Sequence, residues 1–527
     1  MSRLHLSQFP QPKQCFHGAV LVLILLFAGR TLYFLVKGSS WYLFFVTDDF
    51  FYYLIPAQKF VATGRFTFDG ITLTNGFHPL WMLTTVLMWL LSFNSTRLFF
   101  VILTIVLSTS AFVTIRLIEG LIRDLELDSF LSPLFIGLTA LVTTGLIFIG
   151  MEIALTIPLY LCFLRSILQY RGAPKEDYAL GLVTLLLIMS RLETAILLLA
   201  VLVVISRRKT QASVIDSFAR VTFVLTPIFL LVYVNVIYLG TPFPVSSLAK
   251  QLVDGGFHFN RRLLGHLLFD RDGMGALLLL PGACFLLYRA WRTTQSSHRF
   301  GLMTTIVYPI VFYGLYGATS DWFCFRWYFY PLPALFVVAS CMLAKRYVAQ
   351  RDHRAEIVYL LTSAGILLFG ASDFYRHTAG FTPEPNSVFK HATLLQKFVA
   401  SHPGLYAMGD RAGLTAFICN VPMLQLEGIS SDLHMIENIR TQSDLLPILK
   451  VHGVRYLIES GQSSMQSTNG CYTIFSPHES MAGGHSLAMH TQLRQRPIFH
   501  VATSRAWGWD TSQDRIGEVN TNVFEIH

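Results

Sequence analysis

Long apolar runs broken by few charges fill most of the first 375 residues, and this feature constrains the fold most. A helix needs about 20 mostly apolar residues to cross a bilayer. Only 13% of the residues are charged, against about 25% in soluble domains. The candidate spans are residues 17–37, 79–93, 98–119, 129–149, 151–169, 178–190, 191–206, 219–239, 274–290, 301–318, 327–344 and 355–372.

These runs predict a mostly α, polytopic membrane helical bundle of about 11 spans over residues 1–375. One run, 79–93, is short and opened by Pro79, and we expect a partial or interfacial helix there. Residues 178–206 must cross outward and return, which predicts two short helices that meet near Arg191.

Residues 376–527 are mixed and polar in character. They hold 11 Lys and Arg against 12 Asp and Glu, whereas residues 1–375 hold 29 against 19. Because Lys and Arg mark cytoplasmic loops, the basic excess reports membrane topology and not nucleic-acid binding. Strand-like runs such as LYAMG and VRYLIES alternate with helical ones. We therefore expect a small α/β domain at 376–527, on the periplasmic face of the inner (cytoplasmic) membrane.

Two adjacent carboxylates, Asp48 and Asp49, lie near the start of the first outer loop, 38–78. Thr47 is a suitable N-cap, so one interpretation is a capped interfacial helix whose acids complement the helix dipole. A cap needs only one polar side chain, so the alternative is a general base or cation ligand. The NGFHP turn that follows would return Asn75 and His78 towards the acids.

Isolated charges interrupt the apolar runs further along the chain. Glu152 lies in GLIFIGMEIALTIPL, and Arg191 and Glu193 lie in LLLIMSRLETAILLL. Charges within a membrane usually pair or face a polar cavity, so these residues predict either an ion pair or a ligand contact.

Two later segments add basic groups on the same inferred side. Lys250 follows GTPFPVSSLA, and Arg326 and Tyr328 belong to RWYFYPLP. Lys and Arg at membrane depth suit a phosphate, although aromatics with one arginine also form interfacial belts.

Other motifs are uninformative or absent. The chain has no Walker A, GxGxxG, HExxH or GxSxG motif, which leaves ATP-driven pumps and nicotinamide enzymes without support. The spacing of His478, His485 and His490 fits no compact metal site. Cys419 and Cys471 share the outer domain, where a disulfide between them is one possibility.

Taken in order, several motifs resemble the GT-C superfamily of integral-membrane glycosyltransferases, bacterial envelope type. They are DDFFYYL, TNGFHPLW, GMEIAL, SRLET, YLGTPFPVSSLAK, RWYFYPLP, MGDRAGLTAF and LQLEGIS. The resemblance implies an inverting transfer of a hexose or pentose from a polyprenyl-phosphate-linked sugar donor to a glycan, lipid or protein acceptor.

The resemblance also implies roles for individual residues. One acid of the first outer loop acts as general base, Asp48 by motif order and Asp49 second. A divalent cation (Mg²⁺ or Mn²⁺) sometimes accompanies that pair. Lys250 and Arg326 match positions of donor-phosphate contacts. Family members usually have Asp-Glu where this chain has Asp-Asp, so which acid has which role stays open.

Two other classes of function are weighed against this one. A transporter or flippase for a lipid-linked glycan would use Glu152, Arg191 and Glu193 as a path across the bilayer. The large outer domain, polar motifs gathered on one face and the lack of repeats disfavour it. A binding module with a membrane anchor would not need so many spans.

Overall fold

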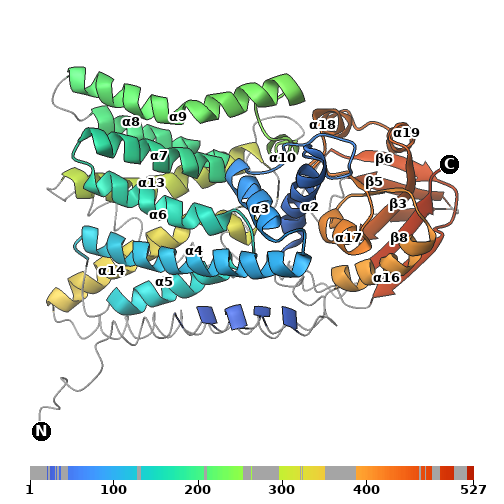
Figure 1. The fold of residues 1–527 in the computed structure, drawn as a ribbon, viewed down its shortest axis with the longest axis horizontal. Helices are drawn as coiled ribbons and strands as arrows, with labels where there is room; N and C mark the ends of the chain where they lie inside the picture. Colours follow the sequence, from blue (N-terminus) through green and yellow to red (C-terminus); the bar gives the residue numbers. More distant parts are fainter. Residues whose placement is uncertain are drawn as a thin grey trace, which may run out of the picture.

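The computed structural model places a helical bundle beside a mixed α/β domain (Figure 1). It describes residues 46–127, 132–206, 211–252, 296–320, 322, 324–350, 387–461, 465–468, 471–476, 487–503 and 519–527, with Leu263 and scattered positions between 21 and 36. The predicted spans 274–290 and 355–372 lie outside the described residues, as does much of 17–37.

The bundle comprises helices that run side by side away from the α/β domain (Figure 1). Its elements are α2 (Asp48–Thr63), α3 (Pro79–Leu91), α4 (Thr96–Asp124), α5 (Ser132–Ile147), α6 (Ile153–Gln169), α7 (Pro174–Ser190), η3 (Leu192–Leu197), α8 (Leu198–Ser206), α9 (Gln211–Leu239), α10 (Val245–Ala249), α13 (Ser296–Thr319), η4 (Arg326–Phe329) and α14 (Leu332–Gln350). Helices α2, α3 and α10 lie at the junction between the bundle and the domain (Figure 1).

Three helices of the described part are long and apolar enough to cross a membrane. They are Thr96–Asp124, Ala212–Leu239 and Phe300–Thr319. Other apolar helices are shorter, among them α3 with 13 residues. At 1.5 Å per residue α3 spans about 20 Å, less than the ~30 Å hydrocarbon core, as expected for a partial helix. The total of about 11 spans stays a prediction.

The expected break within 178–206 falls at Arg191. Helix α7 ends at Ser190, Arg191 is extended with φ −155° and ψ 117°, and the 3₁₀ turn η3 follows before α8. An extended residue interrupts the helical ladder, so its side chain is projected from a gap between two short helices. Arg191 itself is 1% exposed.

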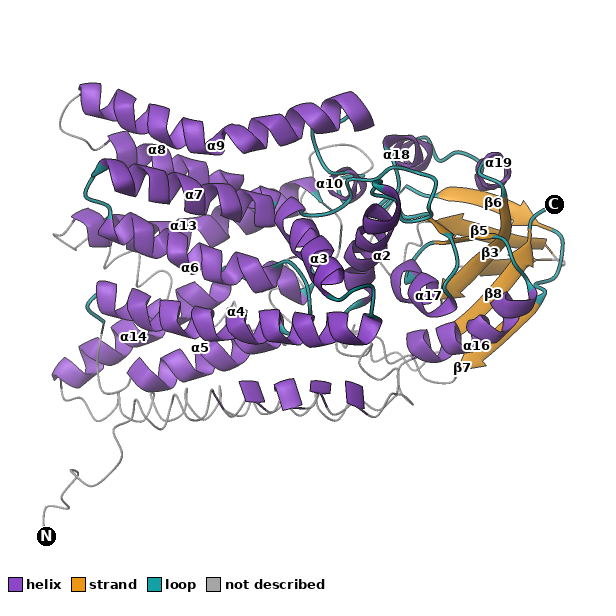
Figure 2. Ribbon diagram, viewed as in Figure 1, coloured by secondary structure: helices purple, strands orange, loops and turns teal. Residues whose placement is uncertain are grey.

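The C-terminal part is an α/β domain, as the alternating pattern predicted (Figure 2). Its elements are α16 (Ser387–Ser401), β1 (Leu405–Met408), α17 (Ala412–Cys419), β2 (Met423–Gln425), α18 (Leu433–Arg440), α19 (Leu445–Val451), β3 (Val454–Gly461), β4 (Met465–Thr468), β5 (Cys471–Ser476), β6 (Met489–Leu493), β7 (Phe499–Thr503) and β8 (Val519–Glu525). One sheet has the order β2-β1-β3-β8-β7 and the other β4-β5-β6.

The first sheet is parallel at one side and antiparallel at the other. Strand β1 pairs in parallel with β2 and β3, whereas β8 runs antiparallel to β3 and β7. After β1 the chain moves to β2 on one side and then to β3 on the other. Strand β1 therefore lies in the middle of the parallel part of the sheet, between β2 and β3.

The possible disulfide between Cys419 and Cys471 is not formed, and both are free thiols. Cys419 ends α17 and points its thiol at the carbonyl of Ala392, whereas Cys471 begins β5 in the second sheet. Occupying one domain did not bring the two thiols together. Of the three histidines near them, His478 and His485 lie outside the described residues, and His490 is exposed on β6.

The domain packs tightly on the junction helices. A Cβ added to Gly76 would lie 1.8 Å from the carbonyl oxygen of Ile429, and one added to Gly413 would lie 2.6 Å from the carbonyl oxygen of Asp48. Phe51 of α2 and Phe417 of α17 also pack together, with ring centroids 4.9 Å apart. Backbone therefore approaches backbone at two places, and both require glycine.

Candidate active site

The acidic pair lies in the first turn of α2, where the exposed N–H groups of a helix favour negative charge. Thr47 occupies the N-cap position but makes no side-chain cap hydrogen bond. Asp48 Oδ1 instead accepts the N–H of Leu414 at 2.6 Å. Leu414 is the third residue of α17, so Asp48 supplies to a different helix the acceptor that an N-cap normally provides.

Helix periodicity gives α2 two polar faces, because residues i and i+4 share a side. Asp48 and Tyr52 face the outer domain, where Asp48 meets α17. Tyr53 faces the bundle, where its hydroxyl donates to Glu152 Oε2 at 3.0 Å. Asp49 precedes Tyr53 by one turn and shares this second face. The adjacent acids therefore make different contacts, although both interact electrostatically with Asp410 and Glu427 of the α/β domain.

The two carboxyl groups differ in their surroundings. Burial raises the pKa of Asp48 to about 7, although the N–H of Leu414 opposes the rise. Burial also raises the pKa of Asp49, but the positive charge of Lys250 limits it to about 6. Asp49 is therefore the acid that is more fully ionised at neutral pH.

Lys250 is positioned by the NGF turn of the first outer loop. Asn75 Oδ1 accepts the N–H of Val245 at 3.0 Å, and Asn75 Nδ2 donates to the carbonyl of Phe243 at 3.4 Å. These bonds fix the start of α10, whose C-cap is Lys250. Ser320 then donates to the carbonyl of Lys250 at 2.7 Å. The Asn75 side chain thus holds backbone, and its predicted substrate contact stays untested.

The lysine side chain lies among groups that favour its positive charge. Burial lowers the pKa of Lys250, but Tyr328 and Asp49 outweigh that effect and the net shift is upward. The ammonium lies 5.8 Å from the centroid of the Tyr328 ring. This distance is within the range of a cation–π contact.

Arg191 forms the centre of a buried charge network. Its Nη1 lies 2.8 Å from Glu152 Oε1, and its Nε lies 2.5 Å from Glu193 Oε1. The predicted ion pair is therefore present, with Glu152 as a third member. His78 Nε2 lies 3.9 Å from Glu152 Oε1, while its buried Nδ1 has no hydrogen-bond partner in the described part of the chain.

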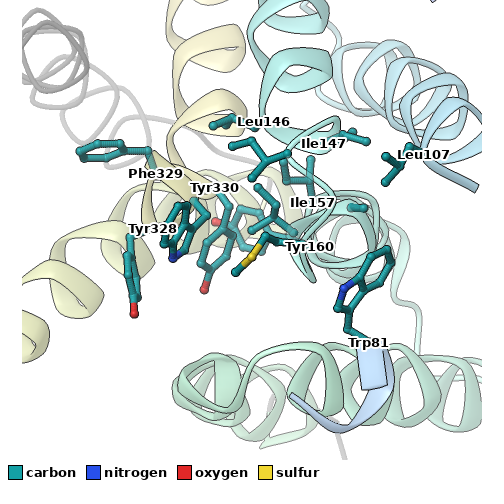
Figure 3. Close-up of a cluster of buried hydrophobic side chains, with 14 of the residues drawn as sticks. Trp81, Leu107, Leu146, Ile147, Ile157, Tyr160, Tyr328, Phe329 and Tyr330 are labelled. Atoms are coloured by element: carbon teal, nitrogen blue, oxygen red, sulfur yellow. The ribbon is translucent and has the colours of Figure 1, made fainter. Parts of the chain in front are cut away.

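The aromatic segment of η4 connects this network to Lys250. The Arg191 guanidinium lies 4.7 Å from the centroid of the Tyr328 ring and 5.1 Å from that of Tyr330. Figure 3 shows the two tyrosine hydroxyls pointing the same way from the cluster that contains Tyr160 and Trp81. Tyr328 thus lies within cation–π range of both Arg191 and Lys250. Arg326 begins η4, but its side chain lies outside the described set.

The outer domain contributes acids that the sequence analysis had not assigned. Glu427 is 3% exposed and accepts a hydrogen bond from Gln425 Nε2 at 3.1 Å. Burial, followed by the charges of Asp410, Asp49 and Asp48, raises its pKa well above the usual value. Asp410 and Glu427 belong to MGDRAGLTAF and LQLEGIS, which are among the motifs of the resemblance. Because both acids are far from Asp48 in the sequence, the sequence analysis could not place them near it.

The side chains around Asp48 and Asp49 do not form an evident binding site for a divalent cation. Within the described ranges, no group of three or more His, Cys, Asp or Glu side chains is arranged to hold a metal. One oxygen of Asp48 is occupied by the N–H of Leu414. The Mg²⁺ or Mn²⁺ of the resemblance stays a prediction, and no chemical step below depends on it.

Comparison with known proteins adds evidence on the fold. No protein-family model and no curated protein sequence matches the chain. ArnT from Cupriavidus metallidurans, solved bound to undecaprenyl phosphate, is similar in structure with a TM-score of 0.52 and 14% identity, over 85% of this chain and 95% of that chain. Its apo form gives a TM-score of 0.50 and 15% identity, over 84% and 93%.

An archaeal structure has the same architecture. The Archaeoglobus fulgidus oligosaccharyltransferase, tethered with an acceptor peptide, gives a TM-score of 0.51 and 11% identity, over 85% of this chain and 69% of that chain. Identities this low bear on the fold alone. At that level they agree with the resemblance drawn from the motifs: the chain shares its fold with ArnT and with the archaeal oligosaccharyltransferase.

Proposed function

We propose that this protein is a membrane glycosyltransferase that moves a sugar from a polyprenyl-phosphate donor to an acceptor hydroxyl, with inversion at the anomeric carbon. The observation that carries the proposal is the electrostatic interaction between Asp49 and Lys250, on a fold shared with an ArnT that binds undecaprenyl phosphate. One group suits proton removal and the other suits a leaving phosphate. Transfer would take place at the outer face of the cytoplasmic membrane.

Asp49 is the proposed general base, in preference to Asp48. The resemblance put Asp48 first by motif order, but the Asp48 carboxylate is engaged by the N–H of Leu414. Asp49 faces Lys250 and has the lower pKa of the two, about 6. A base must be ionised to accept a proton, and a pKa just below the working pH gives the best combination of charge and basicity.

The proposed chemistry balances within the site. The acceptor oxygen attacks the anomeric carbon while its proton passes to Asp49, and the bond from that carbon to the phosphate oxygen breaks. Polyprenyl phosphate leaves with an additional negative charge. Lys250 stabilises that charge, and more so as it develops, which is the condition for accelerating the step. Arg326 is a second predicted phosphate contact.

The Arg191 network has a positioning role in this proposal. Its guanidinium contacts the rings of Tyr328 and Tyr330, and Tyr328 in turn contacts Lys250. Glu152 and Glu193 each form an ion pair with the guanidinium, so the tyrosine rings that contact it are held in place next to Lys250. Rigid support of a charged group lowers the reorganisation needed in the transition state.

Native mass spectrometry of the detergent-purified protein tests the proposal. Wild type and Asp49→Asn are incubated with undecaprenyl phosphate and with membrane extracts that contain lipid-linked sugars. Retention of a polyprenyl phosphate, and of a hexosylated or pentosylated form by Asp49→Asn, is the expected result. Failure of both proteins to retain any isoprenoid phosphate would contradict the proposal and direct attention to a transporter of another cargo.

A further inference from the structure

The carboxyl ends of two neighbouring parallel strands present acids towards the start of α2. Gly409 and Asp410 follow β1, and Leu426 and Glu427 follow β2. The chain continues from β1 to its neighbour β2 and then crosses to β3 on the other side of β1. In open α/β sheets, ligands bind outside the carboxyl ends of the strands.

Two buried hydroxyls at this edge have no hydrogen-bond partner among the described residues. They are the Tyr52 hydroxyl, on the outward face of α2, and Ser476 Oγ, at the end of β5. The side chains belong to residues that are 5% and 3% exposed. Buried polar groups are nearly always satisfied, so two unsatisfied ones in one place need an explanation.

Both hydroxyls lie by the acids. A Cβ added to Gly409 would lie 3.2 Å from Ser476 Oγ and 3.8 Å from Glu427 Cγ, so both side chains lie close to the carboxyl end of β1. Tyr52 interacts electrostatically with Asp48 and Glu427, which together with burial raise the pKa of its hydroxyl. Asp48 and Asp410 are partly exposed, so the edge opens to solvent there.

We propose that this edge is the acceptor subsite, and that it takes the hydroxyl groups of a neutral sugar through Tyr52, Glu427, Ser476 and Asp410. The inference rests on the proposed function and deepens it by naming the acceptor class. Hydroxyls both donate and accept, so they match a mixture of carboxyl and hydroxyl groups. Asp410 is paired with Arg411 at 3.3 Å, and the remaining acids leave the edge unfavourable for a phosphate or carboxylate.

Helix α2 would then separate the two substrates. Its Asp48 and Tyr52 face the outer domain and the acceptor, and its Asp49 faces Lys250 and the donor phosphate. Asp49 also interacts electrostatically with Asp410 and Glu427, so the proposed base is coupled to the acids of the acceptor edge as well as to Lys250. The base thus stands at the boundary of the two subsites.

Ser476→Ala and Tyr52→Phe test the inference. Ser476→Ala deletes a hydroxyl that has no hydrogen-bond partner among the described residues, so it should leave the melting temperature unchanged. Tyr52→Phe keeps the packing of ring 52 against Phe68, whose centroid lies 5.3 Å away, but it also removes the interaction of the hydroxyl with Asp48. Ser401→Ala, which removes an exposed hydroxyl at the end of α16 that donates to the carbonyl of Phe398, is the control for loss of a serine hydroxyl elsewhere.

Binding is measured by saturation-transfer NMR on the full chain in nanodiscs. The probes are methyl glycosides of glucose, galactose, mannose and N-acetylglucosamine, with glucuronic acid and inorganic phosphate as anionic counterparts. We expect at least one neutral glycoside to bind, and both variants to weaken it by about three- to tenfold, the worth of one hydrogen bond. Ser401→Ala should bind like wild type.

Several outcomes would overturn the inference. They are the absence of binding by every neutral glycoside, stronger binding of glucuronic acid or phosphate at the same edge, and unchanged glycoside affinity in both variants. Undecaprenyl phosphate binding is measured in parallel. If it persists while glycoside binding fails, only the acceptor subsite is wrong; if it is absent from wild type, the proposed function itself fails.

Discussion

Replacing Asp48 separates the two roles assigned to the acidic pair. The Asp48 carboxylate accepts the N–H of Leu414 at 2.6 Å and so caps α17 from another helix. Asp48→Ala removes the acceptor, whereas Asp48→Asn keeps an oxygen at the same place. We therefore expect Asn, but not Ala, to preserve the joint between α2 and the outer domain.

The size of the effect follows from the type of bond. Replacing a capping side chain with Ala costs about 0.5–2 kcal/mol, and hydrogen bonds to a charged group contribute about 1.5–3 kcal/mol. Because burial raises the pKa of Asp48 to about 7, the group is only partly ionised at neutral pH. A value of about 1–2 kcal/mol is therefore expected, which corresponds to roughly 5- to 30-fold in an opening equilibrium.

Hydrogen exchange and activity measure the two roles independently. In Asp48→Ala, the amide of Leu414 should exchange about 5- to 30-fold faster, and in Asp48→Asn it should stay within a few-fold of wild type. Transfer of the lipid-linked sugar should fall by about 10²- to 10⁴-fold in Asp49→Asn, the usual contribution of a general base. Asp48→Asn should retain transfer within about tenfold.

Two results would refute this reasoning. If Asp48→Asn is as inactive as Asp49→Asn while the Leu414 amide stays protected, then Asp48 is the base and the motif order was the better guide. If Asp49→Asn keeps full transfer, neither the base nor its pairing with Lys250 has been assigned correctly.

Four further predictions concern the acidic pair, the Arg191 network and the junction at Gly76. The transfer rate should rise with pH through about 6, because Asp49 must be ionised to accept a proton. Thermal stability should fall as pH rises from about 4 to about 7, because the folded state raises the pKa values of Asp48 and Asp49 above 3.8 and so binds more protons than the unfolded chain. Arg191→Met should lower the melting temperature strongly, because breaking a buried pair costs about 3–5 kcal/mol; differential scanning fluorimetry measures it. Gly76→Ala should reduce folded yield, since its Cβ would lie 1.8 Å from the Ile429 oxygen; size-exclusion chromatography measures it.

Each of these has an outcome that contradicts it. A pH–rate profile flat between 5 and 8 would remove Asp49 as the titrating base. An unchanged melting temperature in Arg191→Met would mean that the ion pairs of Arg191 with Glu152 and Glu193 contribute nothing to stability. Leu199→Met, at an exposed residue of α8, is the control for this substitution. A monodisperse Gly76→Ala protein with normal yield would show that the contact relaxes.

The sequence predicted features that depend on local patterns. The break at Arg191 could be anticipated because a charge within an apolar run is costly and 29 residues had to cross and return. The α/β pattern of the outer domain was equally readable, since alternation reports strands. The capping position of Thr47 was anticipated as well, although its side chain makes no bond.

What escaped prediction depends on contacts between distant segments. The partners of Asp48 and Asn75 lie 366 and 170 residues away, so no spacing rule could relate them. Glu427 lay in the LQLEGIS motif without an assigned role, and Ser476 belonged to no motif; both matter because strand ends bring them close to Gly409. Cys419 and Cys471 show the converse: two residues can belong to the same domain without being in contact, and both are free thiols.

The capping of α17 by Asp48 has a consequence for biogenesis. During synthesis the acidic pair is made early, and Leu414 follows 366 residues later. Until the outer domain has folded, Asp48 lacks the N–H that fixes it and α17 lacks its cap. Long-range contacts of this kind form late in folding. A chain in which the α/β domain has not yet been made or folded would thus contain Asp48 and Asp49 in an unassembled site, and folding of that domain would complete the proposed active site.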